Sequence, residues 1–164
     1  MGRLVTVRRA TSADSAELAR LRWEFRPQDQ QAQGLDEFSR EFRGWLVKAL
    51  TTDTWMAAVA DDGNDALVGC ILLRSVSKVP NPGAIDRAWG YVTNSYVAPA
   101  HRGQGVGGKL LEVVIAAARE RGHEFLIVWP SEEALSLYTR AGFREVADVH
   151  AGPDDYPPLE LRLS

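Results

Sequence analysis

The apolar residues at the start of the chain change from an alternating to a helical spacing. Residues 5–8 alternate between hydrophobic and polar types, which predicts a short first strand. Leu18, Leu21 and Phe25 then recur three and four positions apart, as residues on one face of an amphipathic helix do. A threonine and a serine at positions 11–12 can cap that helix, because hydroxyl oxygens accept hydrogen bonds from the free N–H groups of a first turn.

A polar segment separates this helix from a second one. Residues 26–34 include Pro27 and Gly34, which both interrupt regular structure, and we expect a loop there. From about Asp36 the apolar residues return to a helical stripe, which predicts a second helix. The members of this stripe are Phe38, Phe42, Trp45, Leu46 and Ala49.

The middle of the chain has the pattern of a β-hairpin followed by a further strand. Residues 54–60 and 66–76 are strand-like, and the turn-forming residues 61–65 lie between them, so we expect an antiparallel pair. A Pro-Asn-Pro-Gly break at 80–83 precedes another strand-like run at 90–97.

The next part of the chain predicts a strand–helix–strand unit. Residues 124–129 form a short and nearly continuous apolar run, which is typical of a strand buried on both faces of a parallel sheet. The run at 90–97 and a helix-like segment at 109–119 precede it. We therefore expect a mixed sheet, antiparallel at its start and parallel around this unit.

The end of the chain predicts one more helix and two closing strands. Ser131 can cap the helix and Gly142 can end it, and strands at 143–149 and 159–163 are joined by a loop at 152–158. The apolar face of the helix comprises Ala134, Leu137, Tyr138 and Ala141.

Composition and charge narrow the function classes. A chain of 164 residues, 45% hydrophobic and 25% charged, is expected to fold as a single domain spanning residues 1–164. Its formal net charge of −3 argues against a nucleic-acid binder that relies on a basic field. No apolar stretch approaches the roughly 20 residues of a membrane span, so we expect no membrane partner.

The single cysteine and the N-terminal residues indicate the compartment. Cys70 has no disulfide partner because the sequence contains no other cysteine. It lies within an apolar run, so it is expected to be a buried, protonated thiol rather than a nucleophile. The N-terminus lacks the apolar region of a signal peptide. We therefore expect a cytoplasmic protein.

The most informative segment is a glycine-rich loop between the predicted strand and helix of this unit. Four of the six residues at 103–108 are glycine. The first N–H groups of a helix lack intrahelical partners and carry the positive end of its dipole. Glycine permits positive φ angles and lets a phosphate approach the main chain without meeting a Cβ atom. The segment therefore predicts a cradle for a phosphate or pyrophosphate.

Three phosphate ligands are candidates for this cradle. Gly103, Gly105 and Gly108 satisfy the dinucleotide pattern G-x-G-x-x-G, but Glu124 begins the next strand rather than ending it, and an antiparallel hairpin precedes the loop. A Walker A loop needs a hydroxyl residue directly after Lys109, where the chain has leucine. The third candidate is the pyrophosphate of coenzyme A.

Two motifs support coenzyme A. Residues 97–107 contain Val-x-Pro-x-x-Arg followed by Gly-x-Gly-x-Gly, and they resemble the core motif of the GCN5-related N-acetyltransferase (GNAT) family. Downstream, Ala134, Leu137, Tyr138 and the pair Gly142–Phe143 are similar to that family's Asn-x-x-Ala-x-x-Leu-Tyr helix, with Ser131 in place of the usual asparagine. The resemblance spans essentially the whole chain. It implies an α+β fold with a central mixed sheet, splayed between its parallel central strands and flanked by about four helices.

The resemblance also assigns candidate site residues. Main-chain amides around residues 104–108 are expected to bind the pyrophosphate. The end of the strand near Val97 is expected to bind the pantetheine arm and to donate a hydrogen bond to the thioester oxygen. The expected cofactor-binding residues are Tyr96, Val97, Arg102, Gly103, Gln104, Gly105, Val106, Gly107, Gly108, Lys109 and Ser131. Tyr138 is the candidate catalytic residue, because a phenol with a pKa of about 10 can protonate a leaving thiolate.

The implied activity is direct transfer of an acetyl group from acetyl-CoA to a primary amine. The acceptor is expected to be a small molecule or a peptide, and the resemblance allows a homodimer. No metal is expected, since His123 and His150 lack metal-ligand spacing. The alternative is a catalytically silent domain that binds acyl-CoA as a sensor or interaction module, while NADH competition would test dinucleotide binding.

The acceptor side is less defined by the sequence. A general base could be Asp86, Glu24 or Glu37. Asn94 and Tyr96 stand two positions apart on the central strand, so strict alternation places them on one face, where they could line the acceptor site. Residues 26–34 are a candidate loop for shaping the acceptor pocket, together with an aromatic wall drawn from Trp23, Phe25, Trp45, Trp89 and Tyr91.

Overall fold

The computed structural model describes residues 4–146 and 157–163, and this part of the chain forms a seven-stranded sheet with the strand order β1-β2-β3-β4-β5-β7-β6. The strands are β1 (Thr6–Arg9), β2 (Trp55–Asp61), β3 (Leu67–Ser77), β4 (Ala88–Val97), β5 (Phe125–Val128), β6 (Arg144–Glu145) and β7 (Leu159–Arg162). The helices are α1 (Ser15–Glu24), α2 (Leu35–Thr51), α3 (Val106–Glu120) and α4 (Leu135–Arg140).

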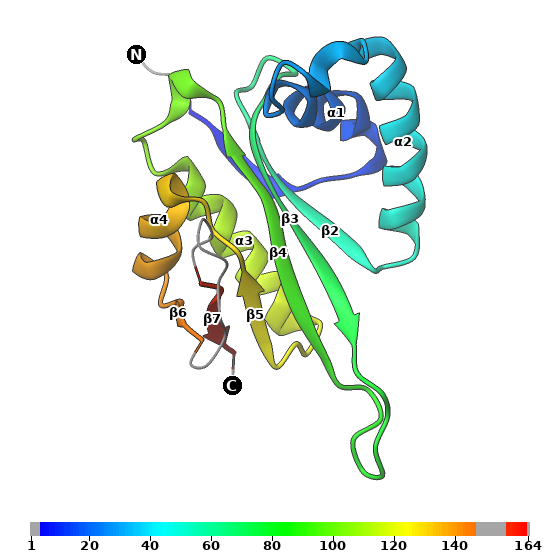
Figure 1. Ribbon diagram of the computed structural model, residues 1–164, viewed down its shortest axis with the longest axis vertical. Coiled ribbons are helices and arrows are strands. Elements are labelled where there is room, and N and C mark those ends of the chain that lie inside the picture. Colours follow the sequence, from blue (N-terminus) through cyan, green and yellow to red (C-terminus); the bar gives the residue numbers. More distant parts are fainter. Residues whose placement is uncertain (1–3, 147–156, 164) are drawn as a thin grey trace.

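The pairing confirms a mixed sheet. Strands β1 to β4 pair in an antiparallel manner, β4 and β5 are parallel, and β7 is antiparallel to both of its neighbours. The hairpin expected from residues 54–76 and the unit formed by β4, α3 and β5 are both present. Helices α1 and α2 cover one face of the sheet, and α3 and α4 cover the other (Figure 1).

The parallel pair β4–β5 separates halfway along β4. Gly90, Tyr91 and Val92 pair with Leu126, Ile127 and Val128, where β5 ends, whereas β4 continues to Val97 alongside β3. The two strands diverge beyond this point (Figure 1). The main chain of residues 93–97 consequently has an edge that β5 does not cover.

A β-bulge lies at the start of this uncovered edge. The β3–β4 register shifts between Cys70 and Leu72, and Asn94 on β4 has a φ of 54°. Asparagine is among the few residues that accept positive φ, whereas a β-branched residue would be strained there. The bulge interrupts strict alternation along β4, so the assumption that placed Asn94 and Tyr96 on one face does not hold at this point.

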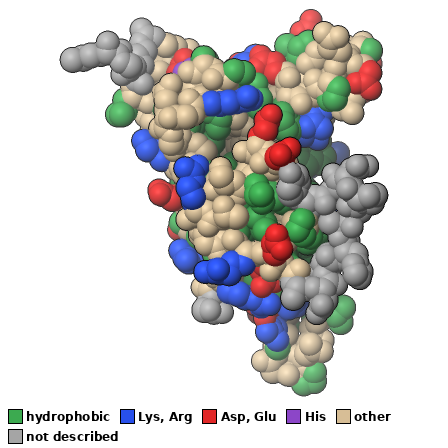
Figure 2. Space-filling model, turned by 60° about the vertical axis from the view of Figure 1, so that its left-hand side comes forward, with side chains coloured by type: hydrophobic (Ala, Val, Ile, Leu, Met, Phe, Trp, Pro, Cys, Tyr) green, Lys and Arg blue, Asp and Glu red, His purple; other side chains and the backbone are tan. Residues whose placement is uncertain are grey.

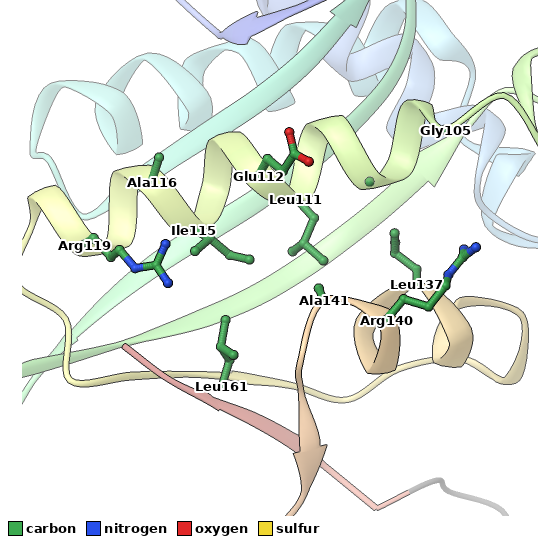
Figure 3. Close-up of a pocket in the computed structure, with 11 residues that line it drawn as sticks. Gly105, Leu111, Glu112, Ile115, Ala116, Arg119, Leu137, Arg140, Ala141 and Leu161 are labelled. Atoms are coloured by element: carbon green, nitrogen blue, oxygen red, sulfur yellow. The ribbon is translucent and has the colours of Figure 1, made fainter. Parts of the chain in front are cut away.

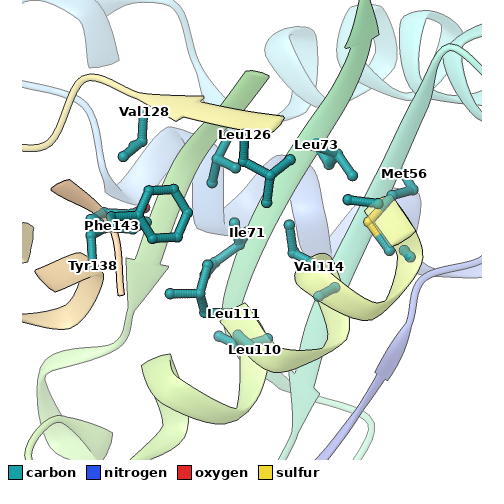
Figure 4. Close-up of a cluster of buried hydrophobic side chains, with 14 of the residues drawn as sticks. Met56, Ile71, Leu73, Leu110, Leu111, Val114, Leu126, Val128, Tyr138 and Phe143 are labelled. Atoms are coloured by element: carbon teal, nitrogen blue, oxygen red, sulfur yellow. The ribbon is translucent and has the colours of Figure 1, made fainter. Parts of the chain in front are cut away.

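Each face of the sheet has its own apolar core. Leu110, Leu111 and Val114 of α3 pack on the sheet, and Tyr138 and Phe143 close the same cluster with ring centroids 5.4 Å apart (Figure 4). Leu18, Leu21 and Leu46 of α1 and α2 form the second cluster on the opposite face. Full burial of a leucine side chain contributes about 2 kcal/mol, so these helices are held mainly by packing.

The helix boundaries follow from local chemistry. Helix α3 begins at Val106, earlier than expected, because Gly105 precedes it in the left-handed conformation with a φ of 79°. Helix α1 begins only at Ser15, since the Asp14 carboxylate accepts the main-chain N–H of Thr11 at 2.8 Å and holds residues 12–14 in a 3₁₀ turn. Phe25, expected on the buried face of α1, follows the helix and is 39% exposed.

The break expected at 80–83 is the tip of a long β3–β4 hairpin. The hairpin extends away from the rest of the molecule, and its tip forms the narrow lower end in Figures 1 and 2. Val79 and Ile85 near this tip are 85% and 67% exposed.

The C-terminal strands agree with the sequence only in part. Gly142 follows α4 with a φ of 98°, as expected for a helix terminator, and β7 lies within the expected range 159–163. The expected strand 143–149 is represented by β6 alone, and its last residues, like most of the loop 152–158, lie outside the described residues. Among the helices described, none is long and apolar enough to cross a membrane.

Candidate functional site

Two connected clefts lie where β4 and β5 separate. One, of about 380 Å³, is lined by the glycine loop, the end of β4 and the start of α4, and we call it the glycine-loop cleft. The second, of about 280 Å³, extends from the bulge of β4 toward α1, and we call it the arginine cleft. Phe25, Ser95, Ser131 and Ala134 line both, so the two form one continuous trough.

The glycine loop presents bare main chain to the glycine-loop cleft. Gly103 and Gly105 have φ angles of 72° and 79°, and a Cβ atom on either would have no neighbour within 4 Å. The φ angles explain why glycine is needed at these positions, while the open space shows that packing does not require it. In the described part of the chain, the N–H groups of residues 103–108 have no backbone acceptor.

The first turn of α3 contains two more glycines. Gly107 faces Leu137 of α4, whose methyl carbons lie 3.5 Å from the position of an added Cβ, whereas Gly108 faces open space. Glycine in a helix costs about 1 kcal/mol relative to alanine. Neither packing nor positive φ accounts for Gly108, which leaves an uncovered patch beside the positive end of the helix dipole.

The polar side chains of this loop lie at different distances from the cleft. The Arg102 Nε donates a hydrogen bond to the Val97 carbonyl at 2.8 Å, so this arginine braces the loop against the end of β4 while lining the cleft. The Gln104 side chain donates to the Ala100 carbonyl at 3.3 Å. Lys109 is exposed and lines neither cleft.

Ser131 lies at the junction of the two clefts. It precedes the 3₁₀ turn Glu132–Ala134 in an extended conformation, but its hydroxyl makes no capping hydrogen bond, so the expected side-chain cap is wrong. The main-chain carbonyl of Ser131 instead accepts the Ala134 N–H at 3.1 Å. The hydroxyl is therefore not committed to the helix.

Tyr138 reaches the arginine cleft from α4. Tyr138 is only 1% exposed, and its ring packs on Phe143. The residue lines the arginine cleft close to Ser95. Burial raises the pKa of the Tyr138 phenol above 10.0, and the Ser95 side chain offsets part of that shift. The phenol therefore stays protonated at neutral pH and can donate a hydrogen bond.

Two arginines that sequence reasoning did not single out also line the arginine cleft. Arg22 projects from α1 and donates from Nη1 to the Asn94 side-chain oxygen at 2.7 Å. Arg26 follows α1, and its guanidinium lies 4.5 Å from the centre of the Phe25 ring. The helical spacing of Arg22 with Leu18 was visible in the sequence, but the position of the cleft was not.

The structure does not bring the expected base candidates to this site. Glu24 pairs with Arg20 on the exposed side of α1 at 2.7 Å, and Asp86 and Glu37 line neither cleft. Among the described residues, the one carboxylate that lines the trough is Glu133, on the glycine-loop side.

The expected aromatic wall is largely wrong. Phe25 reaches the trough, where it packs on Tyr96 at 5.3 Å, and Trp129, which sequence reasoning missed, lines the arginine cleft. Tyr91 packs on Trp129, directly behind the lining of the arginine cleft. The remaining aromatic residues pack elsewhere, Trp45 on Trp55 and Trp89 on Phe125, while the Trp23 indole N–H donates to the Gln33 carbonyl.

The described residues contain neither a reactive thiol nor a cluster of potential metal ligands. Burial raises the pKa of Cys70 to about 12, so the thiol stays protonated, as expected for a core residue. Residues 4–146 and 157–163 contain no group of three or more potential His, Cys, Asp or Glu metal ligands. His150 lies outside this part of the chain.

A third hollow continues from the glycine loop. It has a volume of about 540 Å³ and runs between α3 and α4, sharing Gly105, Gly108, Leu137 and Arg140 with the glycine-loop cleft. Side chains of the two helices face one another across it (Figure 3). The site thus extends from the arginine cleft, past the glycine loop, to the outer surface of α3.

The chain matches one protein family and many solved structures of the same fold. The sequence model of the acetyltransferase (GNAT) family matches residues 16–143. No curated protein matches the chain by sequence.

Three solved structures illustrate the likeness. A GCN5-related N-acetyltransferase from Ralstonia eutropha JMP134 is 26% identical, with a TM-score of 0.67 over 91% of this chain and 98% of its own. A predicted acetyltransferase from Clostridium acetobutylicum, crystallised with acetyl-CoA, is 18% identical, with a TM-score of 0.71 and coverages of 91% and 96%. The PaiA N-acetyltransferase from Thermoplasma acidophilum, in complex with coenzyme A, is 13% identical, with a TM-score of 0.73 and coverages of 97% and 99%.

Proposed function

Because the chain belongs to the acetyltransferase (GNAT) family, we propose that it transfers an acetyl group from acetyl-CoA directly to a primary amine. The observation that carries the proposal is the free main chain of residues 103–108, which opens onto a trough leading along the uncovered edge of β4 to Tyr138. This arrangement would supply an anion cradle, an extended binding edge and a proton donor in sequence along one path.

The donor fits the residues of the glycine-loop cleft and the hollow beside it. The N–H groups of residues 103–108 would hold the pyrophosphate, with the positive end of the α3 dipole behind them. The uncovered edge of β4 up to Val97 would pair with the amides of the pantetheine arm. Arg140, which lines both the cleft and the α3–α4 hollow, would face the nucleotide end.

The chain's own groups would stabilise the reaction in two ways. A main-chain N–H near Val97 would donate to the thioester oxygen as negative charge develops there. The Tyr138 hydroxyl would donate a proton to the departing sulfur, since its raised pKa keeps it protonated. Ser95 and Ser131 at the junction of the clefts would orient the two reacting groups.

The acceptor amine must lose a proton before it can attack. An alkylamine with a pKa of about 10.4 is neutral to only about 0.04% near pH 7, so a path for its proton is required. No carboxylate among the described residues lines the arginine cleft. We propose that the proton leaves through water in the trough, toward Glu133 or solvent.

A silent acyl-CoA-binding module is the second candidate function. It uses the same cradle but needs no proton donor. The position of Tyr138, buried yet lining the trough beside Ser95, favours the enzyme.

The first test is calorimetric titration with acetyl-CoA, CoA and NADH. The wild-type protein is expected to bind both CoA species at micromolar concentrations and to ignore NADH. In Gly105→Val, the β-branched side chain meets a φ of 79° and projects into the cradle, so CoA binding should be lost. Circular dichroism of the variant serves as the folding control.

Each outcome of this test selects one function. Binding followed by acetyl-CoA consumption with any member of an amine panel supports the enzyme, and binding without consumption supports the silent module. Absence of CoA binding by the folded wild type would overturn both, and NADH binding would return the loop to a dinucleotide site.

A further inference from the structure

The arginine cleft holds two cations without described acidic partners. Within residues 4–146 and 157–163, neither Arg22 nor Arg26 forms a salt bridge, whereas Arg8, Arg9, Arg20, Arg87, Arg121 and Arg162 each pair with a carboxylate. Both side chains are half-buried. A charge withdrawn from water costs free energy unless an opposite charge compensates for it, so an uncompensated pair in a cleft favours an anion.

The hydrogen-bond donors of these arginines are largely unused. The Arg22 Nη1 donates a hydrogen bond to the side-chain oxygen of Asn94, and the other N–H groups of Arg22 have no acceptor among the described residues. Among residues 4–146 and 157–163, the Arg26 side chain donates no hydrogen bond; its Nε is buried, so its two Nη groups are the donors that face the cleft. A guanidinium offers five N–H donors in a planar fork that matches a carboxylate or phosphate, so most of this capacity remains available to a ligand.

The electrostatic surroundings agree with this reading. Burial is the main cause that lowers the pKa of Arg22, and the positive charge of Arg26 lowers it further, so the two cations lie within range of one another. No carboxylate in the described part of the chain raises the pKa of Arg22; only Cys70 and Tyr91 offset part of the shift.

The other groups that line the cleft suit an anion. Thr93, Ser95 and Ser131 supply hydroxyl groups, and Phe25 supplies an aromatic face against Arg26. The bulge at Asn94 turns the strand at this point and holds Arg22 through the asparagine amide. The cation pair is therefore built into the fold rather than left free on the surface.

We propose that the arginine cleft binds the anionic group of the acceptor, and that the acceptor is a small primary amine carrying a carboxylate or a phosphate. The inference rests on the proposed function, because it makes this cleft the acceptor end of the trough. The cleft meets the glycine-loop cleft at Ser95 and Ser131, so an anion on the arginines would leave an amine a few bonds away near the proposed transfer point.

The test compares amines that differ only in the anionic group. The carboxylate arm pairs each protein amino acid with its decarboxylated amine, such as tyrosine with tyramine. The phosphate arm pairs phosphoethanolamine with ethanolamine. We expect the anionic member of at least one pair to have a kcat/KM about tenfold or more above that of its neutral partner, as charge-assisted hydrogen bonds allow. The arm that shows the preference identifies the anion.

Two variants and one matched control locate the effect. Arg26→Gln and Arg22→Lys are each expected to lower the preference for the anionic amine about tenfold, through a higher KM. Arg26→Gln removes a positive charge, and Arg22→Lys keeps the charge but removes the planar guanidinium that binds an anion through two N–H groups. Arg43→Gln makes the same charge change on the exposed surface of α2, away from all three hollows, and should leave both members of each pair unchanged.

The outcomes separate this inference from the proposed function. If neutral members are acetylated as well as anionic ones, or if Arg26→Gln affects both equally, the anion site is overturned while the acetyltransferase stands. If no amine is acetylated although CoA binds, the proposed function fails, and calorimetric titration of the CoA-loaded protein with the same amines then tests the anion site on its own. If the anionic amines bind more tightly than the neutral ones and Arg26→Gln weakens that binding, the anion site is supported. If the anionic amines show no such preference, the anion site is overturned.

Discussion

At the residue scale, Tyr138 combines a packing position with a proposed chemical role. Its ring belongs to the core formed by α3 and the sheet, and its hydroxyl end lies at the arginine cleft. The sequence placed it on the apolar face of a helix, which is compatible with either role. The three-dimensional arrangement supports both at once, because the core fixes the ring and thereby the direction of the hydroxyl.

Replacing this tyrosine with phenylalanine tests its chemical role. Tyr138→Phe removes the proposed proton donor and should lower kcat about 100-fold, the usual contribution of a general acid. The cost in folding stability should be only about 1 kcal/mol, the worth of one hydrogen bond. Steady-state kinetics with the best amine, beside acetyl-CoA titration calorimetry, measures the effect. A kcat within a factor of two of the wild type, with donor affinity intact, would remove Tyr138 from the mechanism.

At the element scale, the glycines at the start of α3 lower the stability of the helix but leave its main chain uncovered. Gly108 lies in the first turn with nothing near its missing side chain, and Gly44 in α2 is equally open. The two glycines share a helical backbone and free space, but only Gly108 adjoins the glycine-loop cleft. They form a matched pair for separating stability from ligand binding.

Alanine at these two positions should have the same effect on stability but different effects on binding. Gly108→Ala and Gly44→Ala should each raise the free energy of unfolding by about 0.5–1 kcal/mol, because alanine has the higher helix propensity. Only Gly108→Ala should weaken CoA binding, since its methyl group occupies space that a phosphate would approach. Urea unfolding and CoA calorimetry on both variants provide the measurement. Wild-type CoA affinity in Gly108→Ala would show that the ligand does not contact this turn.

At the scale of the whole molecule, a polar network around the buried His123 joins segments far apart in the sequence. The Arg121 guanidinium bonds the Asp53 carboxylate at 2.9 Å and the Ser75 hydroxyl at 3.2 Å, and that hydroxyl lies 2.9 Å from the His123 Nε2. His123 packs against Gly90 of β4, where an added Cβ would lie only 2.9 Å from its Nδ1. The network ties the end of α3 to β3 and to the turn before β2.

The histidine in this network should make stability depend on pH. Burial, and then the charge of Arg121, lowers the pKa of His123 below 6.5, so the unfolded chain binds more protons than the folded one in mild acid. Its contribution is complete above pH 6.5 and is lost as the pH falls toward the folded-state pKa. The slope is at most about 1.4 kcal/mol per pH unit.

Urea unfolding between pH 7.5 and 5 measures this dependence. The free energy of unfolding of the wild type should fall more steeply with acidification than that of His123→Gln, which keeps a polar group but cannot titrate. Carboxylates with lowered pKa values, such as Asp14 and Glu17, titrate below this pH range in both proteins, so their contributions to the free energy of unfolding cancel in the comparison. Parallel profiles for the two proteins would show that His123 does not carry the effect.

Most elements of this fold could be predicted from the sequence because their signals are local. The turn residues at 61–65 gave the β2–β3 hairpin, the apolar run at 124–129 gave the parallel strand β5, and Gly122 and Gly142 follow their helices with φ angles of 70° and 98°. Errors arose where a tertiary contact intervened. The start of α1 shifted because the Asp14 carboxylate, which accepts the Thr11 N–H, is held in place by Arg8 of β1 at 2.8 Å.

The sequence by itself determined the glycine loop, the strand–helix–strand unit around it and the family, since each depends on residue types at short and fixed spacings. Only the tertiary structure decided where β5 stops alongside β4, where the bulge at Asn94 falls, and that Arg22 and Arg26 line one cleft with Tyr138. The physical reason is distance along the chain. The arginines and the tyrosine are more than 100 positions apart, and only packing of α1 and α4 against the two sides of the splayed sheet brings them together.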